Sequence, residues 1–407
     1  MMSSRLPIAE KLEWGKFVSP ISDRNTSPYN WYSFKHRFGS GLVENIFNSF
    51  SLKKGDIVFD PFCGGGTTLI KAKTTGYNAI GLDISPFAVF LTNSLTTSYN
   101  SIRLRKILEK ITHRANREIL IPDVDILRKA FSDSALQYIF SLKKTIELFD
   151  TPERDFFLLC LLTILNSVSK AKKSGGFLRI TCRRRSGPLS IKKTFMETCE
   201  RFIQDVEQLK LNGNLVKAYI GDARHYPFWL KNKKFDAILT SPPYPNRHDY
   251  TRIYELELLV GFITSNKALK ELRYDTLRSH VEAKKKHNPK GYHYPSLLLS
   301  LVEKLQERPL NNPRIIPTLE GYFEDMYLSL REMSKVIKKR GKIGIVVSNV
   351  RFAGIVIPVD ELLGIIGEQV GLKIKNIHIL RYRGNSSQQM LEYKRVPNRE
   401  SLVIFEK

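Results

Sequence analysis

The sequence is short of acidic residues. Its 407 residues include 40 Asp and Glu against 65 Lys and Arg, which gives a formal net charge of +25 at pH 7. Such an excess is far from the near-neutral charge typical of small-molecule enzymes, and it favours a polyanionic partner. A lysine-rich surface that only reflects genome composition is the alternative, so charge alone does not identify the partner.

Long apolar runs and cysteine motifs are also missing. The longest apolar run, residues 156–165, is too short to cross a bilayer, and the first residues contain no apolar signal-peptide core. The four cysteines, Cys63, Cys160, Cys182 and Cys199, form no C-x-x-C pair and have no histidine spacing suited to zinc. We therefore expect reduced thiols, no metal and a cytoplasmic protein.

The sequence does contain the pattern of an α/β protein. Hydrophobic residues make up 42% of the chain, enough for a sizeable core. A strand at 56–60, a glycine loop, a helix ending at Gly76 and a strand ending near Asp83 predict a βαβ unit with parallel strands. Further strands are predicted in VKAYIGDA, FDAILT and three C-terminal segments. Together they indicate a doubly wound sheet of roughly seven strands.

The βαβ unit contains the first candidate site. Asp60, Gly64, Gly65 and Gly66 lie where a strand ends and a helix begins, so the backbone can approach a ligand closely and helix N–H groups point toward it. Asp83, about 23 residues after Asp60, has the position of a carboxylate that binds ribose hydroxyls. This pattern indicates an adenosine-containing cofactor, although a glycine cluster alone also fits tight strand-to-helix packing. No Lys-Ser/Thr pair follows the glycines, which excludes a P-loop.

The second candidate site is the tetrad Ser241-Pro242-Pro243-Tyr244, which directly follows the predicted strand FDAILT. It should therefore lie at the carboxyl end of the sheet, where open α/β sheets bind ligands. A proline pair in an ordinary loop, followed by a packing aromatic, is the alternative for the tetrad alone. The presence of both motifs on correctly placed strands makes that alternative much weaker.

The two motifs resemble those of the amino-methylating DNA methyltransferases, which modify cytosine N4 or adenine N6. DPFCGGGTT is similar to their cofactor motif D-P-F-x-G-x-G-T-T, and SPPY is similar to their catalytic tetrad. The resemblance implies a Rossmann-like S-adenosylmethionine-dependent methyltransferase fold, S-adenosyl-L-methionine as cofactor and double-stranded DNA as partner. A restriction endonuclease or another defence-system protein is a further possible partner, and the sequence does not decide between these and a lone methylase.

The resemblance also implies roles for individual residues. Its cofactor-binding positions map onto Asp60, Pro61, Phe62, Gly64, Gly66, Thr67, the ribose carboxylate Asp83 and an adenine-side Asp222. The upstream segment WYSFKHRFGSGLV resembles the part that closes over the methionine end of the cofactor, with Lys35, His36 and Phe38 as candidates. In the tetrad, Ser241 and the Pro242 carbonyl would accept hydrogen bonds from the base amine while Tyr244 stacks on a flipped base.

The base that is methylated follows from the first residue of the tetrad. In the family a leading serine is associated with cytosine N4 and a leading aspartate with adenine N6, so we predict cytosine N4 and keep adenine N6 open. C5 methylation needs a cysteine nucleophile, typically after proline, and the chain has no Pro-Cys pair; Cys63 is interpreted as a packing residue. An RNA amino-methyltransferase and a catalytically silent DNA-binding scaffold are the remaining alternatives. Only about 50 residues precede the cofactor loop, which we take as little room for an RNA-binding domain.

Arginines near the tetrad and in a cationic stretch are the predicted DNA contacts. They are Arg183, Arg184 and Arg185 before the tetrad, and Arg247 and Arg252 directly after it. A solvated cationic face is the alternative for the first group, and a structural ion pair with Asp249 is the alternative for the second.

These assignments divide the chain into six predicted parts. They are an N-terminal segment that closes over the cofactor (1–50), the cofactor-binding βαβ unit (51–84), a helical insertion (85–211), the catalytic strands (212–250), a basic inserted module (251–320) and the C-terminal part of the sheet (321–407). Either insertion is a candidate for target recognition.

Overall fold

A computed structural model describes residues 6–114, 119–182, 186–211, 214–245, 248–384 and 396–407. Its main sheet has eight strands in the order β1-β11-β12-β8-β7-β2-β3-β6. All neighbouring strands are parallel except β12, which is antiparallel to both β8 and β11. The strands are β1 (Ile8–Glu10), β2 (Ile57–Asp60), β3 (Asn78–Asp83), β6 (Val216–Ile220), β7 (Phe235–Thr240), β8 (Ile337–Ser348), β11 (Lys373–Arg383) and β12 (Asn398–Glu406).

The sheet is therefore a mostly parallel, doubly wound one, with one strand more than the predicted seven. The extra strand is β1, in which Ile8 pairs with Ile377 of β11 at the sheet edge. Its three residues are all exposed, so no apolar alternation marks this strand in the sequence. The other seven strands were all predicted.

The strand order reverses between β2 and β7. From β2 the chain moves outward to β3 and then β6, and it returns to β7 on the opposite side of β2. Ligands of open α/β sheets bind at such a switch point, outside the carboxyl ends of the strands. Here Asp60 ends β2 and Thr240 ends β7.

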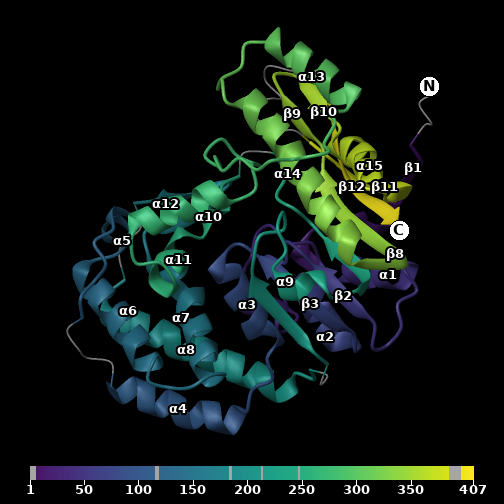
Figure 1. The fold of residues 1–407 in the computed structure, drawn as a ribbon. Helices are drawn as coiled ribbons and strands as arrows, with labels where there is room; N and C mark the ends of the chain where they lie inside the picture. Colours follow the sequence, from purple (N-terminus) through teal and green to yellow (C-terminus); the bar gives the residue numbers. More distant parts are fainter. Residues whose placement is uncertain (1–5, 115–118, 183–185, 212–213, 246–247, 385–395) are drawn as a thin grey trace.

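Alternating side chains of the central strands pack against helices on both faces of the sheet. Val58 and Ala237 belong to the cluster on the α1 and α2 side, whereas Phe59 and Ile238 belong to the cluster on the α14 and α15 side. This period of two is expected for strands buried on both faces. The helices, visible in Figure 1, are α1 (Ser40–Ser49), α2 (Thr67–Thr75), α14 (Ile315–Val336) and α15 (Val359–Gln369).

The first insertion forms a helical lobe beside the sheet (Figure 1). Its central helix α7 has the sequence ERDFFLLCLLTILNSV, apolar almost all round, and is buried accordingly. The lobe contains α3 (Pro86–Thr96), α4 (Ser101–Arg114), α5 (Asp125–Ala130), α6 (Asp133–Ile146), α7 (Glu153–Val168) and α8 (Pro188–Gln208). The cationic stretch between α7 and α8 contains an antiparallel hairpin of β4 (Ala171–Ser174) and β5 (Phe177–Ile180), which the sequence did not predict.

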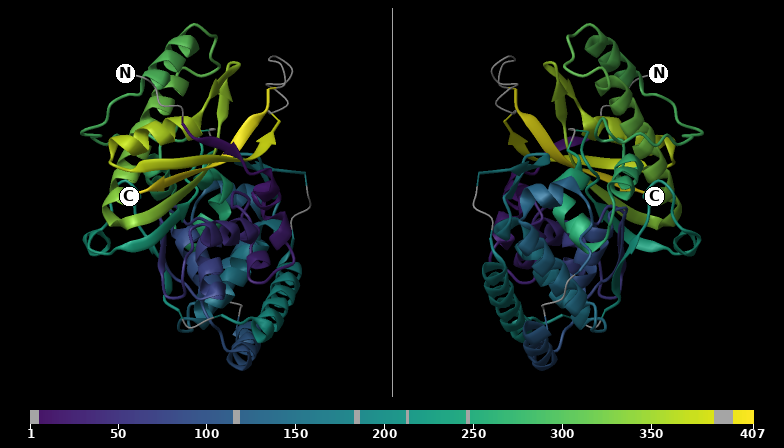
Figure 2. Two further views of the ribbon diagram at one scale, coloured as in Figure 1. Left: turned by 90° about the vertical axis from the view of Figure 1, so that its right-hand side faces the viewer. Right: turned by 90° about the vertical axis from the view of Figure 1, so that its left-hand side faces the viewer.

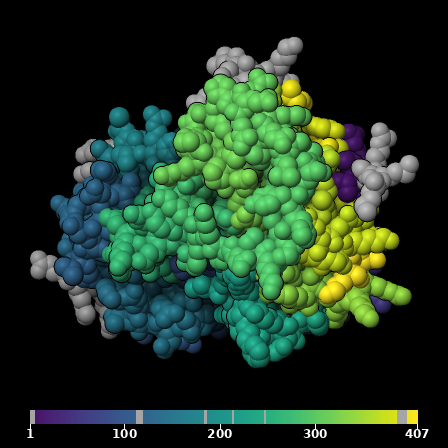
Figure 3. Space-filling view, turned by 45° about the horizontal axis from the view of Figure 1, so that its top comes forward, coloured from purple at the N-terminus to yellow at the C-terminus, as the bar shows by residue number. Residues whose placement is uncertain are grey.

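The second insertion is largely helical and lies between the helical lobe and the C-terminal strands. In Figure 3 the second insertion lies in green on the face toward the viewer, with the first insertion in blue beside it. It contains α10 (Tyr250–Ile253), α11 (Glu255–Gly261), α12 (Asn266–Asp275) and α13 (Ser296–Gln306). Leu256 and Leu259 of α11 pack into the same cluster as α7, so the two insertions share a core.

The remaining short elements connect these layers. The N-terminal segment contributes three 3-10 turns, and its Trp31 is buried in the helical lobe, where its ring stacks on Phe202 at 4.8 Å. The short elements are η1 (Leu12–Phe17), η2 (Pro20–Asp23), η3 (Tyr29–Trp31), α9 (Phe228–Lys231), β9 (Val350–Phe352) and β10 (Ile355–Ile357). No helix within the described residues is both long and apolar enough to span a membrane, and all four cysteines are free thiols.

Candidate active site

A pocket opens at the carboxyl ends of β2, β3, β6 and β7, at the switch point of the sheet. Most of the predicted cofactor residues line it together with half of the tetrad: Phe38, Asp60, Pro61, Phe62, Gly64, Thr67, Asp83, Asp222, Ser241 and Pro243. The fold thus brings two motifs about 180 residues apart into one wall. Their predicted roles in binding and catalysis stay predictions.

The glycine loop makes the floor of the pocket. Gly64 and Gly66 have φ angles of +48° and +77°, which other residues rarely adopt. A Cβ on Gly66 would lie 2.7 Å from Thr92 Oγ1, and one on Gly65 would lie 2.9 Å from the Phe34 ring. Gly66 itself is not among the lining residues, because it precedes α2 and packs against Thr92. The three glycines therefore allow the loop to turn tightly between strand and helix.

Two carboxylates, Asp60 and Asp83, fix the loop. Asp83 Oδ2 accepts a 2.9 Å hydrogen bond from the Gly64 N–H, which joins the end of β3 to the loop. Asp60 Oδ1 accepts a 2.6 Å hydrogen bond from the Thr240 hydroxyl, and Thr240 directly precedes Ser241. Burial raises the pKa of the Asp60 carboxyl to about 6. The Asp60–Thr240 contact thus connects the cofactor loop to the tetrad across the switch point.

The tetrad residues face two environments. Ser241 and Pro243 line the pocket, whereas Pro242 is buried and Tyr244 packs against the core on the α14 side. The Tyr244 hydroxyl lies 3.5 Å from Ser241 Oγ, so the two side chains remain in contact. The aromatic rings that line the pocket include Phe34 and Tyr254, which stack on each other at 4.5 Å.

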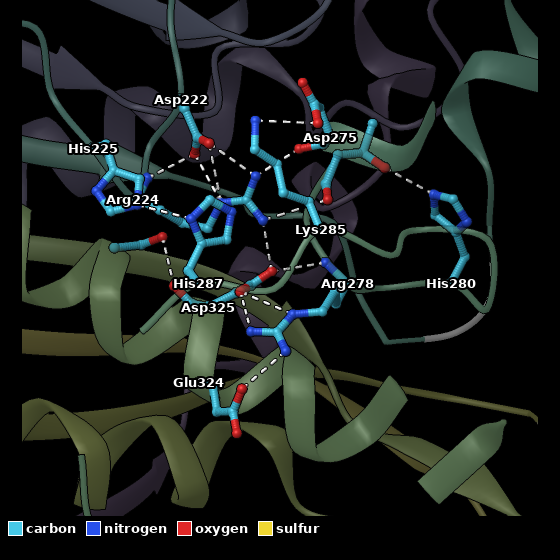
Figure 4. Close-up of polar contacts among 12 residues, drawn as sticks. Asp222, Arg224, His225, Asp275, Arg278, His280, Lys285, His287, Glu324 and Asp325 are labelled. Carbon is cyan, nitrogen blue, oxygen red and sulfur yellow. Dashed lines mark hydrogen bonds and ion pairs between the residues drawn. The ribbon is translucent and has the colours of Figure 1, made fainter. Parts of the chain in front are cut away.

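Asp222 is held by an arginine that sequence reasoning missed. The Arg224 guanidinium, only 1% exposed, contacts both carboxylate oxygens of Asp222 and lies 2.8 Å from Asp325 on α14. Burial acts to raise the pKa of Asp222, but the Arg224 contacts outweigh it and lower that pKa. Figure 4 shows Arg224 between the two carboxylates, with Arg278 on the other side of Asp325. The string GDAR directly after β6 is the only trace of this pairing in the sequence.

The same network holds part of the second insertion against the pocket. Arg224 Nη2 donates to the carbonyl of Asp275, and Arg278 pairs with Asp325 and with Glu324. Leu272, Thr276 and His280, close to these residues in the chain, line the pocket. The pocket therefore has a second wall that is positioned by side-chain ion pairs.

The N-terminal segment closes one side of the pocket, with His36, Arg37 and Phe38 in the lining. Lys35 points elsewhere and donates a 2.5 Å hydrogen bond to the carbonyl of Lys173. Arg37 was not singled out from the sequence, yet its Nη2 donates to the Tyr29 carbonyl while its Nε and Nη1 are buried without a hydrogen-bond partner. Burial lowers the pKa of His36 to about 4, so this ring is neutral near pH 7.

The predicted DNA-binding arginines are only partly placed. Arg183, Arg184, Arg185 and Arg247 lie outside the described residues. Arg252 is half exposed, and its guanidinium lies 3.4 Å from Asp249, which also lies 2.9 Å from Arg273. Asp249 caps α10 by accepting from the N–H of Thr251. The structural alternative for Asp249, an ion pair with arginine, is thus the arrangement that the fold contains.

Sequence comparisons relate this chain to known DNA methylases. A family model described as a DNA methylase, N6_N4_Mtase, matches residues 14–94. Type II methyltransferase M.BsoBI of Geobacillus stearothermophilus is 32% identical over 459 aligned positions, covering 96% of this chain and 88% of that protein. Type II methyltransferase M.AvaI of Nostoc sp. is 29% identical, covering 96% and 89%. The crystal structure of TrmN from Thermus thermophilus covers 93% of this chain and 52% of its own, at 10% identity and a TM-score of 0.32.

The family model and the long alignment with M.BsoBI identify an S-adenosylmethionine-dependent methyltransferase that acts on DNA. More particularly, the chain belongs to the family of Type II DNA methyltransferases that modify an exocyclic amine, N4 of cytosine or N6 of adenine. The length of the match with M.BsoBI supports this assignment, because it covers 96% of this chain.

The residues present fit S-adenosyl-L-methionine as the cofactor. Asp83 lines the pocket and offers carboxylate oxygen for ribose hydroxyls. At another side of the pocket, the unpartnered Nε and Nη1 of Arg37 are the donors that a methionine carboxylate requires. Among the described residues no cluster of His, Cys, Asp and Glu is arranged for a metal ion.

Proposed function

We propose that this enzyme methylates N4 of cytosine in double-stranded DNA. The observation that carries the proposal is the position of Ser241, which leads the tetrad and lines the same pocket as Asp60 and Asp83. In the family that the motifs resemble, a leading serine accompanies cytosine N4. Adenine N6 is the alternative, and the two amines differ little in geometry.

The proposed roles follow from the chemistry of a base amine, a poor nucleophile because its lone pair is delocalised into the ring. Acceptors at Ser241 Oγ and the Pro242 carbonyl would hold the amino protons and orient the nitrogen lone pair. When held by the glycine loop and Asp83, the cofactor would supply the electrophilic methyl group on a sulfonium that the base nitrogen requires, with a neutral thioether as the leaving group. The nitrogen then releases one proton to solvent. Tyr244 would stack on the flipped base after leaving its packed position beside Ser241.

The contact between Asp60 and Thr240 would keep these groups in register with the cofactor. A hydrogen bond of 2.6 Å between buried side chains restricts the loop that carries Ser241. Small errors in such positioning reduce methyl transfer strongly, since orientation is the main contribution of the protein to this reaction. Asp60 and Thr240 therefore act as positioning residues in the proposed mechanism.

Arginines around the pocket are proposed to bind the DNA backbone. Arg252 carries a half-exposed guanidinium next to the tetrad segment, and Arg183, Arg184, Arg185 and Arg247 are proposed on sequence grounds alone. Phosphate contacts of this kind position a duplex without reading its sequence. The Type II methyltransferases that this chain resembles also suggest a companion endonuclease, from which the methylation would protect the same DNA.

The test is transfer of labelled methyl from S-adenosylmethionine to duplex DNA, followed by mass spectrometry of the nucleosides. We expect N4-methylcytosine from the wild type. The Ser241→Ala variant should lose most of its kcat while binding the cofactor normally, and Ser49→Ala, which changes an exposed serine on α1, should behave as the wild type. N6-methyladenine as the product would overturn the choice of cytosine, and label in RNA alone would overturn DNA as substrate.

A further inference from the structure

The hairpin of β4 and β5 presents an unusual exposed face. Lys172 pairs across the hairpin with Arg179, and Ser174 pairs with Phe177, so these side chains share one face. Lys172 and Arg179 are exposed, and neither forms an ion pair with a described residue. Phe177 is 52% exposed on the same face. Exposed cations around an exposed aromatic ring are the chemistry that binds phosphates and stacks on bases.

The opposite face of the hairpin is firmly anchored. Lys173 points inward and its Nζ lies 2.7 Å from Glu257, whose side chain is fully buried. Glu257 also accepts hydrogen bonds from the Tyr32 hydroxyl at 2.6 Å and the Asn166 amide at 2.7 Å. The Lys173 ammonium lies 4.4 Å from the centre of the Tyr254 ring, and Tyr254 lines the pocket. The hairpin is thus held at a fixed position relative to the pocket.

The turn of the hairpin lies against the segment that follows the tetrad. A Cβ on Gly176 would lie 2.7 Å from Nδ1 of His248, so a larger residue there would have to displace the His248 ring. His248 is four residues after Tyr244, and its ring lies 5.5 Å from that of His36, which lines the pocket. Phe177, the next residue after Gly176, is therefore close to the mouth of the active site. In the left view of Figure 2, the teal chain near residue 180 lies at the outer edge of the molecule, between the strands and the helices.

We propose that this hairpin enters the DNA duplex beside the target base. In this proposal Phe177 stacks on the bases next to the space that the flipped nucleotide leaves, and Lys172 and Arg179 bind the flanking phosphates. A base can reach a buried amine pocket only by leaving the stack, and a side chain that stacks in its place reduces the cost of unstacking. Charge complementarity with the polyanionic duplex selects DNA as the occupant of this face. The inference rests on the enzyme being a DNA methyltransferase, and it holds for cytosine N4 or adenine N6 alike.

The test compares two duplexes that carry the methylated site, once this site has been mapped on genomic DNA. One duplex has the normal base pair at the target, and the other has an abasic position opposite the target, which leaves the base easy to flip. We expect Phe177→Ala to lower kcat/KM by about tenfold or more on the paired duplex and by much less on the abasic one. Phe177→Trp should retain wild-type rates, and Phe228→Ala, which removes an aromatic ring that is 79% exposed on α9, should change nothing.

A second measurement tests the two cations independently. The double variant Lys172→Gln and Arg179→Gln should reduce the slope of log binding constant against log salt concentration by about 2, because two phosphate contacts are lost. Unchanged melting temperature and cofactor affinity would show that the variants are folded. Wild-type kcat/KM for Phe177→Ala, or an equal loss on both duplexes, would overturn the proposal. Since methyl groups are counted on whichever base accepts them, failure of the cytosine assignment would appear separately as N6-methyladenine.

Discussion

The pocket has two walls that the chain builds in different ways. The first wall is local: Asp60, the glycine loop and Asp83 fall within 24 consecutive residues, and backbone N–H groups fix its side chains. The second wall joins distant segments, since Arg224 meets Asp325 across 101 residues of sequence. A wall made by backbone geometry needs particular residues at fixed spacing. A wall made by ion pairs needs only partners that meet after folding, and it is held by buried charges that are costly to separate.

Breaking the ion pairs of the second wall should have the largest effect on stability. Arg224→Met leaves Asp222 without its cation and removes one of the two arginines that pair with Asp325, and breaking a buried ion pair from one side costs about 3–5 kcal/mol of unfolding free energy. Urea denaturation followed by circular dichroism measures this loss. Arg128→Met is the control, because that arginine forms its ion pairs with exposed aspartates on the surface and should change stability little. A small effect of Arg224→Met would mean that packing alone places the second wall.

In the first wall, replacement of Asp83 should act mainly on cofactor binding. We expect Asp83→Ala to weaken S-adenosylmethionine binding by about 100-fold or more, because hydrogen bonds to a charged group contribute about 1.5–3 kcal/mol each. Isothermal titration calorimetry measures the affinity. Asp125→Asn removes a carboxylate that is 89% exposed on α5 and serves as the control. Tight binding by Asp83→Ala would remove the ribose role from this residue.

The contrast between the walls explains what the sequence predicts well. Asp60, Gly64 and Asp83 were assigned to one site because parallel strands bring their carboxyl ends together, and the pocket contains all three. Seven of the eight strands were predicted from their apolar runs, although β6 at the sheet edge is mostly exposed. The local sequence pattern thus predicts most of the sheet and the first wall.

The rest depends on contacts that no local pattern records. In the string KHR, Lys35 and Arg37 are both cations, yet Lys35 turns to a carbonyl of the hairpin while Arg37 lines the pocket. The hairpin at Ala171–Ile180 was hidden because its strands are short, cationic and mostly exposed. For Arg252 the sequence leaves open a DNA contact or an ion pair with Asp249, and the structure contains the ion pair, with Arg273 as a second partner of Asp249. Tertiary pairing, rather than propensity, decided each case.

Within the first wall, replacement of Asp60 should increase stability, whereas Arg224→Met should decrease it. Its pKa rises from 3.8 to about 6 on burial, so between these values the folded protein binds more protons than the unfolded chain, and stability falls as pH increases. Asp60→Asn removes this cost and should therefore stabilise the unliganded protein above pH 6, by on the order of 1–3 kcal/mol. Denaturation at pH 4.5 and pH 7.5 measures the difference, which should be larger at pH 7.5. Equal stability of the two proteins at both pH values would contradict the raised pKa.

The smallest predicted effect concerns Arg37, which closes the pocket between the two walls. If its unpartnered Nε and Nη1 bind the methionine carboxylate, Arg37→Leu should weaken S-adenosylmethionine binding by about tenfold, the worth of one charge-assisted hydrogen bond. Binding of 5′-methylthioadenosine, which lacks the amino-acid end, should stay unchanged in the same variant. This pair of ligands separates a direct contact from a distorted pocket, because distortion would weaken both. An equal loss of affinity for both ligands would mean that Arg37 shapes the pocket, and that another residue binds the methionine carboxylate.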